Sequence, residues 1–521
     1  MTIQIHRKSK SLILPTALQD FIVDLPHKKV VLDGKEFVAV KHDETATTAL
    51  RQAGLECPSP VLTYHNLPLI GGRWKPFDHQ LKTIEFFTLN KRCICLNEMG
   101  LGKSASALLA ADYLMSIGEV HRVLILSPLS TLDCVWANEI FNTLPDRTYS
   151  VIYGSATKRK QLLSYKTDFA VLNHEGLAVV YDELFNDKSI DLLIVDESSV
   201  YRNSGTERYK KLKNFLQPRH RFWAMSGSPT PTAPTDCWSI ARIINPNGVN
   251  RFFGAFRKET MYQITPFKWA ARKGAEHIVK KALSPSIRFK KSECLDLPPQ
   301  IFERREASLT PEQDRIFKSM KAKMEADIGD EKLTAVNAAA KFGVLRQILG
   351  GCYKVAGEEA QYNEIDCQPR LNAMLEAIEE SETKVIVFVP YTGMLHMVAK
   401  TIAKHHTVKI IEGDTAGNER NQIIQDFQTQ ENPRVIVASD RCISHGVTLT
   451  EADTVIWYCP TTSADAFAQA NARVDRPGQT RTTTVVLIGT HKFEWAMYDG
   501  LKDKLDMQQL VLDLMGELNL A

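Results

Sequence analysis

CLNEMGLGKSASALLAADYL, residues 95–114, begins as an apolar strand, turns through two glycines and continues as a run of helix formers. Gly100 and Gly102 allow the backbone to approach a ligand closely, and the following helix directs its N-terminal N–H groups toward the same point. This arrangement is typical of a phosphate-binding loop. It predicts that Lys103 reaches the β- and γ-phosphates of a nucleotide and that Ser104 holds Mg²⁺.

Asn97 departs from the GxxxxGK[ST] pattern, which has a glycine at this position. The change leaves the backbone donors of the loop and Lys103 in place, so it does not remove the groups that bind phosphate. The alternative is a chance match at the start of a helix.

A second motif follows another apolar strand. IVDESSVYRN, residues 194–203, places Asp196 and Glu197 directly after that strand. Ligands of open parallel sheets bind at the carboxyl ends of the strands. We therefore expect Asp196 to orient Mg²⁺ and Glu197 to position or deprotonate the attacking water, whereas an Asp-Glu pair without this context is usually solvated.

Two series of short apolar runs alternate with helix-length segments along the chain. Such runs indicate parallel sheets with helices on both faces, and hence an α/β fold. Residues 246–370, between the series, are richer in helix formers and charge and predict a helical insertion. The first series is CICLN (93–97), VLILS (123–127), FAVLN (169–173), LLIVD (192–196) and FWAMS (222–226); the second is KVIVFV (384–389), VKII (408–411), RVIVAS (434–439), TVIWY (454–458) and TVVLI (484–488).

Composition limits the class of protein. The chain has 521 residues, enough for about three domains, and 44% of them are hydrophobic. We find no apolar run near the ~20 residues of a membrane span, so we expect a soluble intracellular protein without a membrane partner. The ten cysteines include no CxxC pair and are expected to be buried reduced thiols rather than zinc ligands.

The net charge is only +3, but basic residues gather in one segment. Residues 251–293 contain eleven basic and three acidic side chains, interleaved with aromatic residues. The segment predicts either a phosphate-contacting surface or an ordinary solvated face. The lysines expected to contact nucleic acid are Lys280, Lys281, Lys290 and Lys291.

The N-terminal 72 residues have a different pattern. KVVLDGKEFVAVKHD (29–43) alternates like a hairpin with an Asp-Gly turn, and ETATTALRQAG (44–54) is typical of a capped helix. The pattern predicts a small α+β module that either recognises DNA structure or serves as a scaffold.

Five motifs together resemble those of the SWI/SNF remodeller-type ATPases of helicase superfamily two. The resemblance covers about residues 73–490, and in that family the loop typically reads DEMGLGKT, so the missing glycine is a family trait. The motifs are NEMGLGKS (97–104), LSPLSTLDCVWANEI (126–140), VDESS (195–199), SGSPTP (226–231) and QANARVDRPGQ (469–479).

The resemblance implies two RecA-like lobes that hydrolyse ATP with Mg²⁺ at the cleft between them. The expected organisation is an N-terminal accessory module (1–72), an ATP-binding first lobe (73–245), a helical protrusion or linker region (246–370), a second lobe (371–490) and a C-terminal helical segment (491–521).

Further site residues are implied by the resemblance alone. Gln80 matches the glutamine that reads adenine, with Phe77 close by. Gln469, Arg473 and Arg476 match the last motif of the second lobe, whose arginines reach the γ-phosphate. The alternative for both arginines is a solvated helix face.

Trp136 and Asn173 are the candidate DNA contacts of the first lobe. A core tryptophan and a strand-end turn are the respective alternatives.

The resemblance implies an ATP-driven translocase on double-stranded DNA that remodels branched DNA or protein–DNA complexes. A strand-separating DNA or RNA helicase is the alternative, and a catalytically inactive DNA-binding protein is the third. Retention of Lys103, Glu197, Arg473 and Arg476 argues against the third. We expect a monomer, in the cytoplasm of a bacterial or phage-infected cell, or in the nucleus if the source is eukaryotic.

Overall fold

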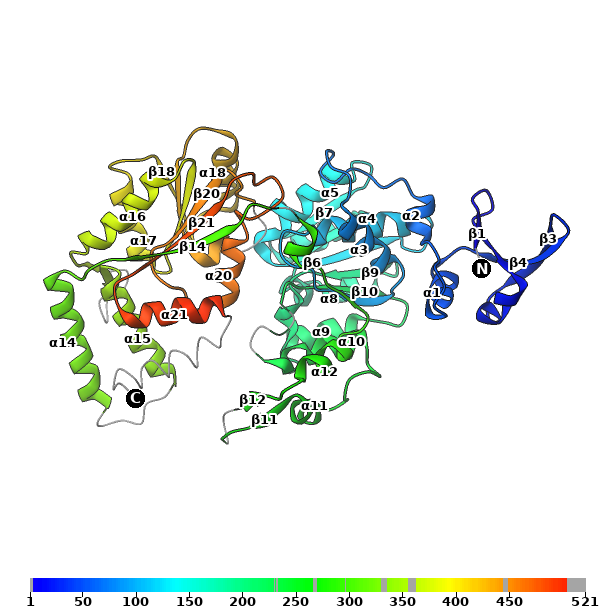
Figure 1. Cartoon of the computed structure of the whole chain (residues 1–521), viewed down its shortest axis with the longest axis horizontal. Coiled ribbons are helices and arrows are strands. Elements are labelled where there is room, and N and C mark those ends of the chain that lie inside the picture. The colour runs from blue at the N-terminus through cyan, green and yellow to red at the C-terminus, as the bar shows by residue number, and fades with distance from the viewer. Residues whose placement is uncertain are drawn as a thin grey trace. The chain divides into compact units, whose positions relative to one another are not determined.

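The computed structural model of the chain is shown in Figure 1. It forms two compact units, Met1–Cys294 (unit 1) and Leu295–Ala521 (unit 2), and each is described by itself. The structure describes residues 3–228, 230, 233–265, 269–295, 297–328, 335–354, 362–443 and 448–503.

Unit 1 begins with a small antiparallel sheet of order β1-β2-β4-β3. The predicted hairpin is confirmed: Leu32 pairs with Lys35, and Asp33 and Gly34 between them both have positive φ, as a tight primed turn requires. Asp43 caps the predicted helix α1 by accepting from an N–H of its first turn. The elements are β1 (Gln4–His6), β2 (Ser11–Pro15), the 3₁₀ helix η1 (Thr16–Ile22), β3 (His27–Leu32), β4 (Lys35–Lys41), α1 (Glu44–Gln52) and α2 (Pro60–Tyr64).

The rest of unit 1 is built on a seven-stranded sheet of order β13-β5-β10-β9-β6-β8-β7, in which every pair is parallel. Its strands are β5 (Arg92–Cys95), β6 (Arg122–Ser127), β7 (Tyr149–Ile152), β8 (Phe169–Asn173), β9 (Ile190–Val195), β10 (Arg221–Met225) and β13 (Ser286–Ile287).

Helices cover both faces of this sheet. Val123 and Ile125 of β6 belong to one hydrophobic cluster, with α3 and α4, whereas Leu124 and Leu126 belong to another, with α9 and α10. Burial on both faces explains why the strands read as near-continuous apolar runs. The helices are α3 (Asp78–Thr88), α4 (Lys103–Ser116), α5 (Asn138–Thr143), α6 (Ala156–Ser164), α7 (Gly176–Val179), α8 (Tyr181–Asn186), α9 (Glu207–Phe215) and α10 (Trp238–Ile244), with short helical turns η2 (Leu129–Thr131), η3 (Leu132–Ala137), η4 (Ser198–Tyr201) and η5 (Pro234–Cys237).

A helix, a two-stranded ribbon and a second helix project from unit 1 between α10 and β13 (Figure 1). The segment then returns to the sheet, where β13 pairs in parallel with β5. These elements are α11 (Phe253–Thr260), β11 (Met261–Gln263), β12 (Trp269–Ala271), α12 (Ala275–Ala282) and, after β13, α13 (Lys291–Cys294).

Unit 2 has a six-stranded sheet of order β14-β21-β20-β17-β19-β18, also parallel throughout. Its elements are β14 (Gln300–Glu306), α14 (Pro311–Ile328), α15 (Ala335–Leu349), β15 (Cys352–Lys354), β16 (Tyr362–Glu364), α16 (Gln368–Glu380), β17 (Lys384–Phe388), α17 (Thr392–Ile402), β18 (Val408–Ile411), α18 (Gly417–Thr429), β19 (Val435–Ala438), α19 (Asp440–Ile443), β20 (Ala452–Trp457), α20 (Ala464–Asn471), β21 (Thr483–Gly489) and α21 (Lys492–Lys502).

Two sheets and a helical region between the strand series were predicted, and β13 and β14 come from within that region, residues 246–370. The region is divided between the two units. The domain boundaries given above stay predictions, and most of the segment 491–521 lies outside the described residues. No helix in the described part of the chain is both long and apolar enough to cross a membrane.

A buried ion pair holds unit 2 together. Arg370 of α16 donates to both carboxylate oxygens of Glu494 in α21, at 2.8 and 3.1 Å, and both side chains are fully buried. The same guanidinium donates to the carbonyls of Tyr458 and Ile488. Two helices and the ends of β20 and β21 are therefore joined through one side chain.

Glu494→Ala is expected to destabilise unit 2 by about 3–5 kcal/mol, because it leaves a buried guanidinium unpaired. Hydrogen exchange of the β20 and β21 amides in the intact chain measures the change. Asp499→Ala is the control: Asp499 pairs with Arg304 at the surface, so less than ~1 kcal/mol is expected. Unchanged protection in Glu494→Ala would contradict this role of the pair.

Candidate nucleotide site

The residues predicted to bind phosphate and Mg²⁺ meet at one edge of the sheet in unit 1. Strands β5, β10 and β9 are neighbours, and their carboxyl ends lead into the loop before Lys103, into Ser226 and into Asp196, respectively. The charge of Lys103 acts on the carboxylate of Asp196 by lowering its pKa. Residues some ninety positions apart therefore form one site, at the place where open parallel sheets bind ligands.

Two glycines shape the loop. Gly100 and Gly102 have φ of 84° and 68°, a backbone conformation that other residues rarely adopt. A Cβ on Gly102 would also lie 2.1 Å from Nε2 of Gln80. Lys103, the first residue of α4, donates from Nζ to the carbonyl of Asn97 at 2.9 Å, so its ammonium lies within the loop.

Asn97 is fully buried and ties the loop to two other segments. Its Nδ2 donates to Oγ1 of Thr83 in α3 at 2.9 Å, and its Oδ1 accepts from the N–H of Phe289, just after β13, at 3.0 Å. A glycine could make neither side-chain bond. The asparagine that departs from the common pattern therefore has a structural role that sequence reasoning did not find.

Gln80 lies against the loop, at the start of α3. Its Oε1 accepts from the N–H of Phe77 at 2.9 Å, and its amide nitrogen faces Gly102. The ring of Phe77 is partly exposed and stacks on His79, with centroids 5.8 Å apart. The structure thus places both predicted adenine-binding residues beside the phosphate loop, and their contact with adenine stays a prediction.

Both carboxylate oxygens of Asp196 accept N–H bonds from within the chain. Oδ1 accepts from the backbone of Glu197 at 3.0 Å, and Oδ2 accepts from Nε1 of Trp136 at 3.2 Å. Burial and the neighbouring charge of Glu197 raise the pKa of Asp196 to about 6, against the opposing effects of Lys103 and Trp136. Glu197 has a left-handed backbone, with φ of 45°, a strained conformation that is common at functional sites.

The structure leaves the Trp136 side chain no exposed surface for the predicted DNA contact. The side chain is fully buried in the core on one face of the sheet, and its N–H is donated to Asp196. Trp136 lies in η3, a π-helical turn, a rare element that often marks functional sites. The alternative given for Trp136, a core tryptophan, agrees with this burial. The indole in addition positions the carboxylate of Asp196.

The prediction that the Asn173 side chain contacts DNA is also not supported. Its Oδ1 accepts from Arg159 at 2.9 Å and its Nδ2 donates to Glu175 at 3.1 Å. Asn173 is the last residue of β8 and is nearly buried. Its polar atoms therefore fix the turn after the strand.

The four predicted lysines lie on two different parts of unit 1. Lys280 and Lys281 lie near the end of α12, where both are exposed. Lys290 pairs with Glu293 at 3.8 Å, while the backbone N–H of Lys291 donates to Glu98 at 2.9 Å. Because Glu98 belongs to the phosphate loop, the second pair of lysines borders the nucleotide site.

In unit 2 the predicted residues lie in and after α20. Gln469 and Arg473 are nearly buried, so a solvated helix face is excluded for Arg473. Arg476 donates to Oγ1 of Thr448 at 2.9 Å and to the carbonyl of Ala472 at 3.3 Å. Burial lowers the pKa of Arg476 to about 10, so the guanidinium remains charged at neutral pH.

Ser104 and Asp196 supply the oxygen atoms that Mg²⁺ prefers, and Mg²⁺ commonly completes its coordination with phosphates and water. The described residues include no group of three or more His, Cys, Asp or Glu side chains that could hold a metal ion. This donor set fits a cation that arrives with the nucleotide.

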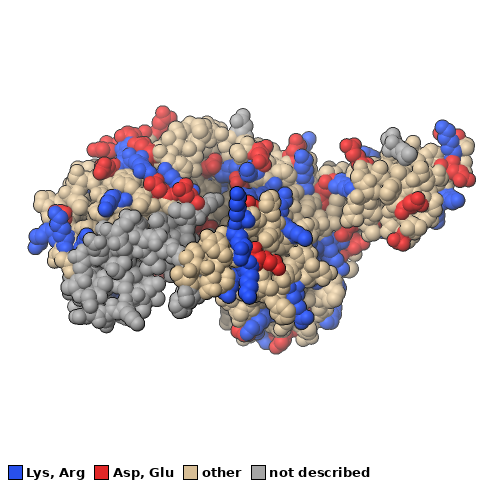
Figure 2. Space-filling model, turned by 60° about the horizontal axis from the view of Figure 1, so that its bottom comes forward, with Lys and Arg blue, Asp and Glu red and all other residues tan. Residues whose placement is uncertain are grey.

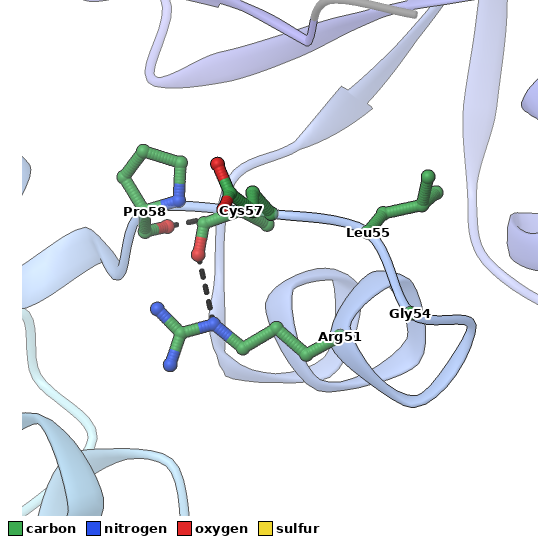
Figure 3. A pocket seen from close by; sticks show the side chains of 6 residues that line it. Arg51, Gly54, Leu55, Cys57 and Pro58 are labelled. Carbon is green, nitrogen blue, oxygen red and sulfur yellow. Dashed lines mark hydrogen bonds between the residues drawn. The ribbon is translucent and has the colours of Figure 1, made fainter.

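A separate open hollow of about 480 Å³ lies at the end of α1 (Figure 3). Arg51 at its edge donates to the carbonyl of Cys57 at 2.8 Å and to Glu85 of α3 at 2.7 Å. Its guanidinium therefore connects the N-terminal module to the lobe. None of the predicted nucleotide-binding residues lines this hollow.

Two family descriptions match the chain. "SNF2-related domain" matches residues 56–355, and "Helicase conserved C-terminal domain" matches residues 369–478. The chain belongs to the SNF2-related family. The resemblance and the two RecA-like lobes predicted from the sequence are thereby confirmed.

Relatives of this SNF2-family chain occur in eukaryotes and bacteria. It is 24% identical to Protein CHROMATIN REMODELING 4 of Arabidopsis thaliana (84% of this chain, 21% of that protein). It is 22% identical to the SWI/SNF-related matrix-associated actin-dependent regulator of chromatin subfamily A-like protein 1 of Drosophila melanogaster (84% and 56%). It is 25% identical to the ATP-dependent helicase MG018 of Mycoplasma genitalium (76% and 38%).

The chain thus spans between about a fifth and just over half of the length of these relatives. Among solved structures, it is similar to the Sulfolobus solfataricus SWI2/SNF2 ATPase core in complex with dsDNA. The identity is 22% and the TM-score 0.40, over 87% of this chain and 95% of that one.

Trp136→Phe is expected to weaken binding of a Mg²⁺–nucleotide complex at acidic pH. Asp196 must be ionised to hold the cation, so affinity should fall as pH drops through about 6. Removing the indole N–H raises the pKa of Asp196 further and moves this loss toward neutrality. Equilibrium titration of a fluorescent ATP analogue with Mg²⁺, between pH 5 and 8, measures it.

Trp223→Phe is the matched control, because Trp223 is equally buried in β10 but donates to the carbonyl of Asn90. Its pH dependence should equal that of the parent. The same shift in both variants would attribute the effect to lost packing rather than to the N–H donated to Asp196.

Proposed function

We propose that the chain is a DNA-dependent ATPase that moves along double-stranded DNA and remodels branched DNA or protein–DNA complexes. One observation carries the ATPase part of the proposal: Lys103, Asp196 and Glu197 lie at one edge of one sheet, with the Asp196 carboxylate held by two N–H donors. The relatives support it, since one is named an ATP-dependent helicase and others are named for chromatin.

The residues of unit 1 supply binding and proton transfer. Lys103 and the N-terminal N–H groups of α4 would neutralise the phosphates. Mg²⁺, held by Ser104 and Asp196, would neutralise further charge on them. Glu197 would position the attacking water and accept its proton.

The residues of unit 2 complete the site in this proposal. Arg473 and Arg476 would stabilise the charge that spreads over the transferred phosphoryl group, as arginine fingers do. Thr448 orients Arg476, since its hydroxyl accepts from the guanidinium. Hydrolysis then requires both units, and DNA that binds both would favour the active arrangement by its differential affinity.

A strand-separating DNA or RNA helicase remains the second candidate, because the same nucleotide site serves either activity. ATPase rates with no nucleic acid, single strands, duplex, forked DNA and RNA distinguish them, together with release of a labelled strand. Stimulation by duplex without strand release supports the translocase. Stimulation by single strands or RNA with strand release would overturn it.

Glu197→Gln is expected to bind ATP normally and to hydrolyse it at least ~100-fold more slowly, because the amide cannot accept a proton. Single-turnover hydrolysis and equilibrium ATP binding, measured on the same preparation, test this. Glu207→Gln in α9 changes an exposed glutamate and should behave as the parent. Loss of ATP binding in Glu197→Gln would assign Glu197 a different role.

Arg476→Ala is expected to lose stimulation by duplex DNA while retaining ATP and DNA binding, because the second unit no longer completes the site. ATPase rate against duplex concentration measures the effect. Arg481→Ala removes an exposed arginine five residues later and should leave stimulation intact. Full stimulation of Arg476→Ala would show that this arginine does not act on the phosphates.

A further inference from the structure

The projection of unit 1 carries exposed aromatic side chains next to arginines and lysines. We refer to residues 251–265 and 269–282, which contain α11, β11, β12 and α12, as the projection. Figure 2 turns the molecule so that the bottom of Figure 1, where α11, β11 and β12 lie, comes forward, and many lysine and arginine side chains, with some acidic ones beside them, are visible on that face.

Aromatic and guanidinium contacts join the projection to α10. The guanidinium of Arg257 lies 4.2 Å from the ring centre of Trp269 and 5.8 Å from that of Phe253. Phe253 in turn meets Trp238 edge-on, at 5.6 Å. Trp238 donates to the carbonyl of Asn250 at 2.9 Å, so the start of α11 is fixed to α10.

Two further aromatic rings face solvent. Phe252 is 69% exposed, and the guanidinium of Arg251 lies 5.8 Å from its ring centre. Tyr262 is 47% exposed, because Met261 beside it in β11 is buried and neighbouring residues of a strand point to opposite faces. The Phe252 backbone N–H donates to Asn250 Oδ1 at 3.1 Å, which fixes the backbone that carries the ring.

The positive charge of the projection is not neutralised locally. Among the described residues of the projection, no basic side chain forms an ion pair with an acidic one, and Arg272 donates instead to the carbonyls of Lys258 and Met261. The exposed or half-exposed basic residues are Arg251, Arg257, Lys258, Arg272, Lys273, Lys280 and Lys281. A ligand that presents both negative charge and flat rings complements such a surface.

We propose that the projection binds unpaired nucleotides of single-stranded DNA, with bases stacked on Phe252 and Tyr262 and phosphates on the surrounding arginines and lysines. Bases inside a duplex have their faces covered by their neighbours, so a duplex offers this surface phosphates and base edges but no base faces. Single-stranded arms expose both the base faces and the phosphates. This proposal rests on the proposed function. It gives the chain forked or gapped DNA as its substrate rather than a uniform duplex.

Equilibrium binding without nucleotide tests the proposal. The probes are a fork with two thymidine arms, carrying 2-aminopurine next to the junction, and a blunt duplex of equal length. Phe252→Ala and Tyr262→Ala should each weaken fork binding ~5- to ~150-fold and relieve 2-aminopurine quenching, as loss of one stacked base does. Duplex affinity and duplex-stimulated ATPase should stay at parental values.

Phe252→Trp and Tyr262→Phe keep a stacking ring and should retain fork binding, which excludes misfolding as the cause of any loss. Phe141→Ala is the matched control: Phe141 in α5 is 65% exposed, and no arginine or lysine lies over its ring among the described residues. It should bind both probes as the parent does.

Two results would overturn the proposal. The first is unchanged fork binding in both alanine variants, which is expected if the rings contact a protein. The second is an equal loss of affinity for the fork and for the duplex. Because binding is measured without ATP, the test is independent of translocation. Selective loss of fork binding in a protein that duplex DNA fails to stimulate would reject the proposed function and leave this inference intact.

Discussion

The hydrogen bonds of Asn97 are the constraint on which the nucleotide site depends. One buried amide joins the phosphate loop to Thr83 of α3 and to Phe289 after β13, segments 14 and 192 residues away in the sequence. Because both polar atoms of a buried amide need partners, the loop cannot move without breaking one of these bonds. The position of Lys103, which donates to the carbonyl of the same residue, is fixed with it.

The candidate nucleotide site is an extension of the hydrophobic core rather than a separate surface feature. Trp136 fills the core on one face of the sheet and donates its single N–H to Asp196 at the strand end. Packing therefore sets the orientation of a carboxylate, and a buried carboxylate with a neighbouring glutamate has its pKa raised to about 6. Electrostatic preorganisation of this kind needs a rigid support, which a sheet buried on both faces supplies.

The sequence predicts the strand, loop and helix around Lys103, and most strands of both sheets. Each of these elements has a local pattern: a continuous apolar run for a strand, a glycine pair for the loop and a run of helix formers for the helix. β14 was not predicted, because it is an edge strand and its sequence, QIFERRE, carries four charged residues. β13 was not predicted either, because it is only two residues long. The bond between Trp136 and Asp196 and those of Asn97 were not predicted either. They join residues distant in sequence, and only tertiary packing brings these together.

The basic segment that appeared as one charge run in the sequence connects two places in unit 1. From α12, with Lys281 near its end, the chain passes within a few residues into β13, which pairs with β5, and then reaches Phe289 and Lys291. Phe289 donates to Asn97 and Lys291 to Glu98, both in the phosphate loop. A short, hydrogen-bonded stretch of backbone thus links the projection to the loop.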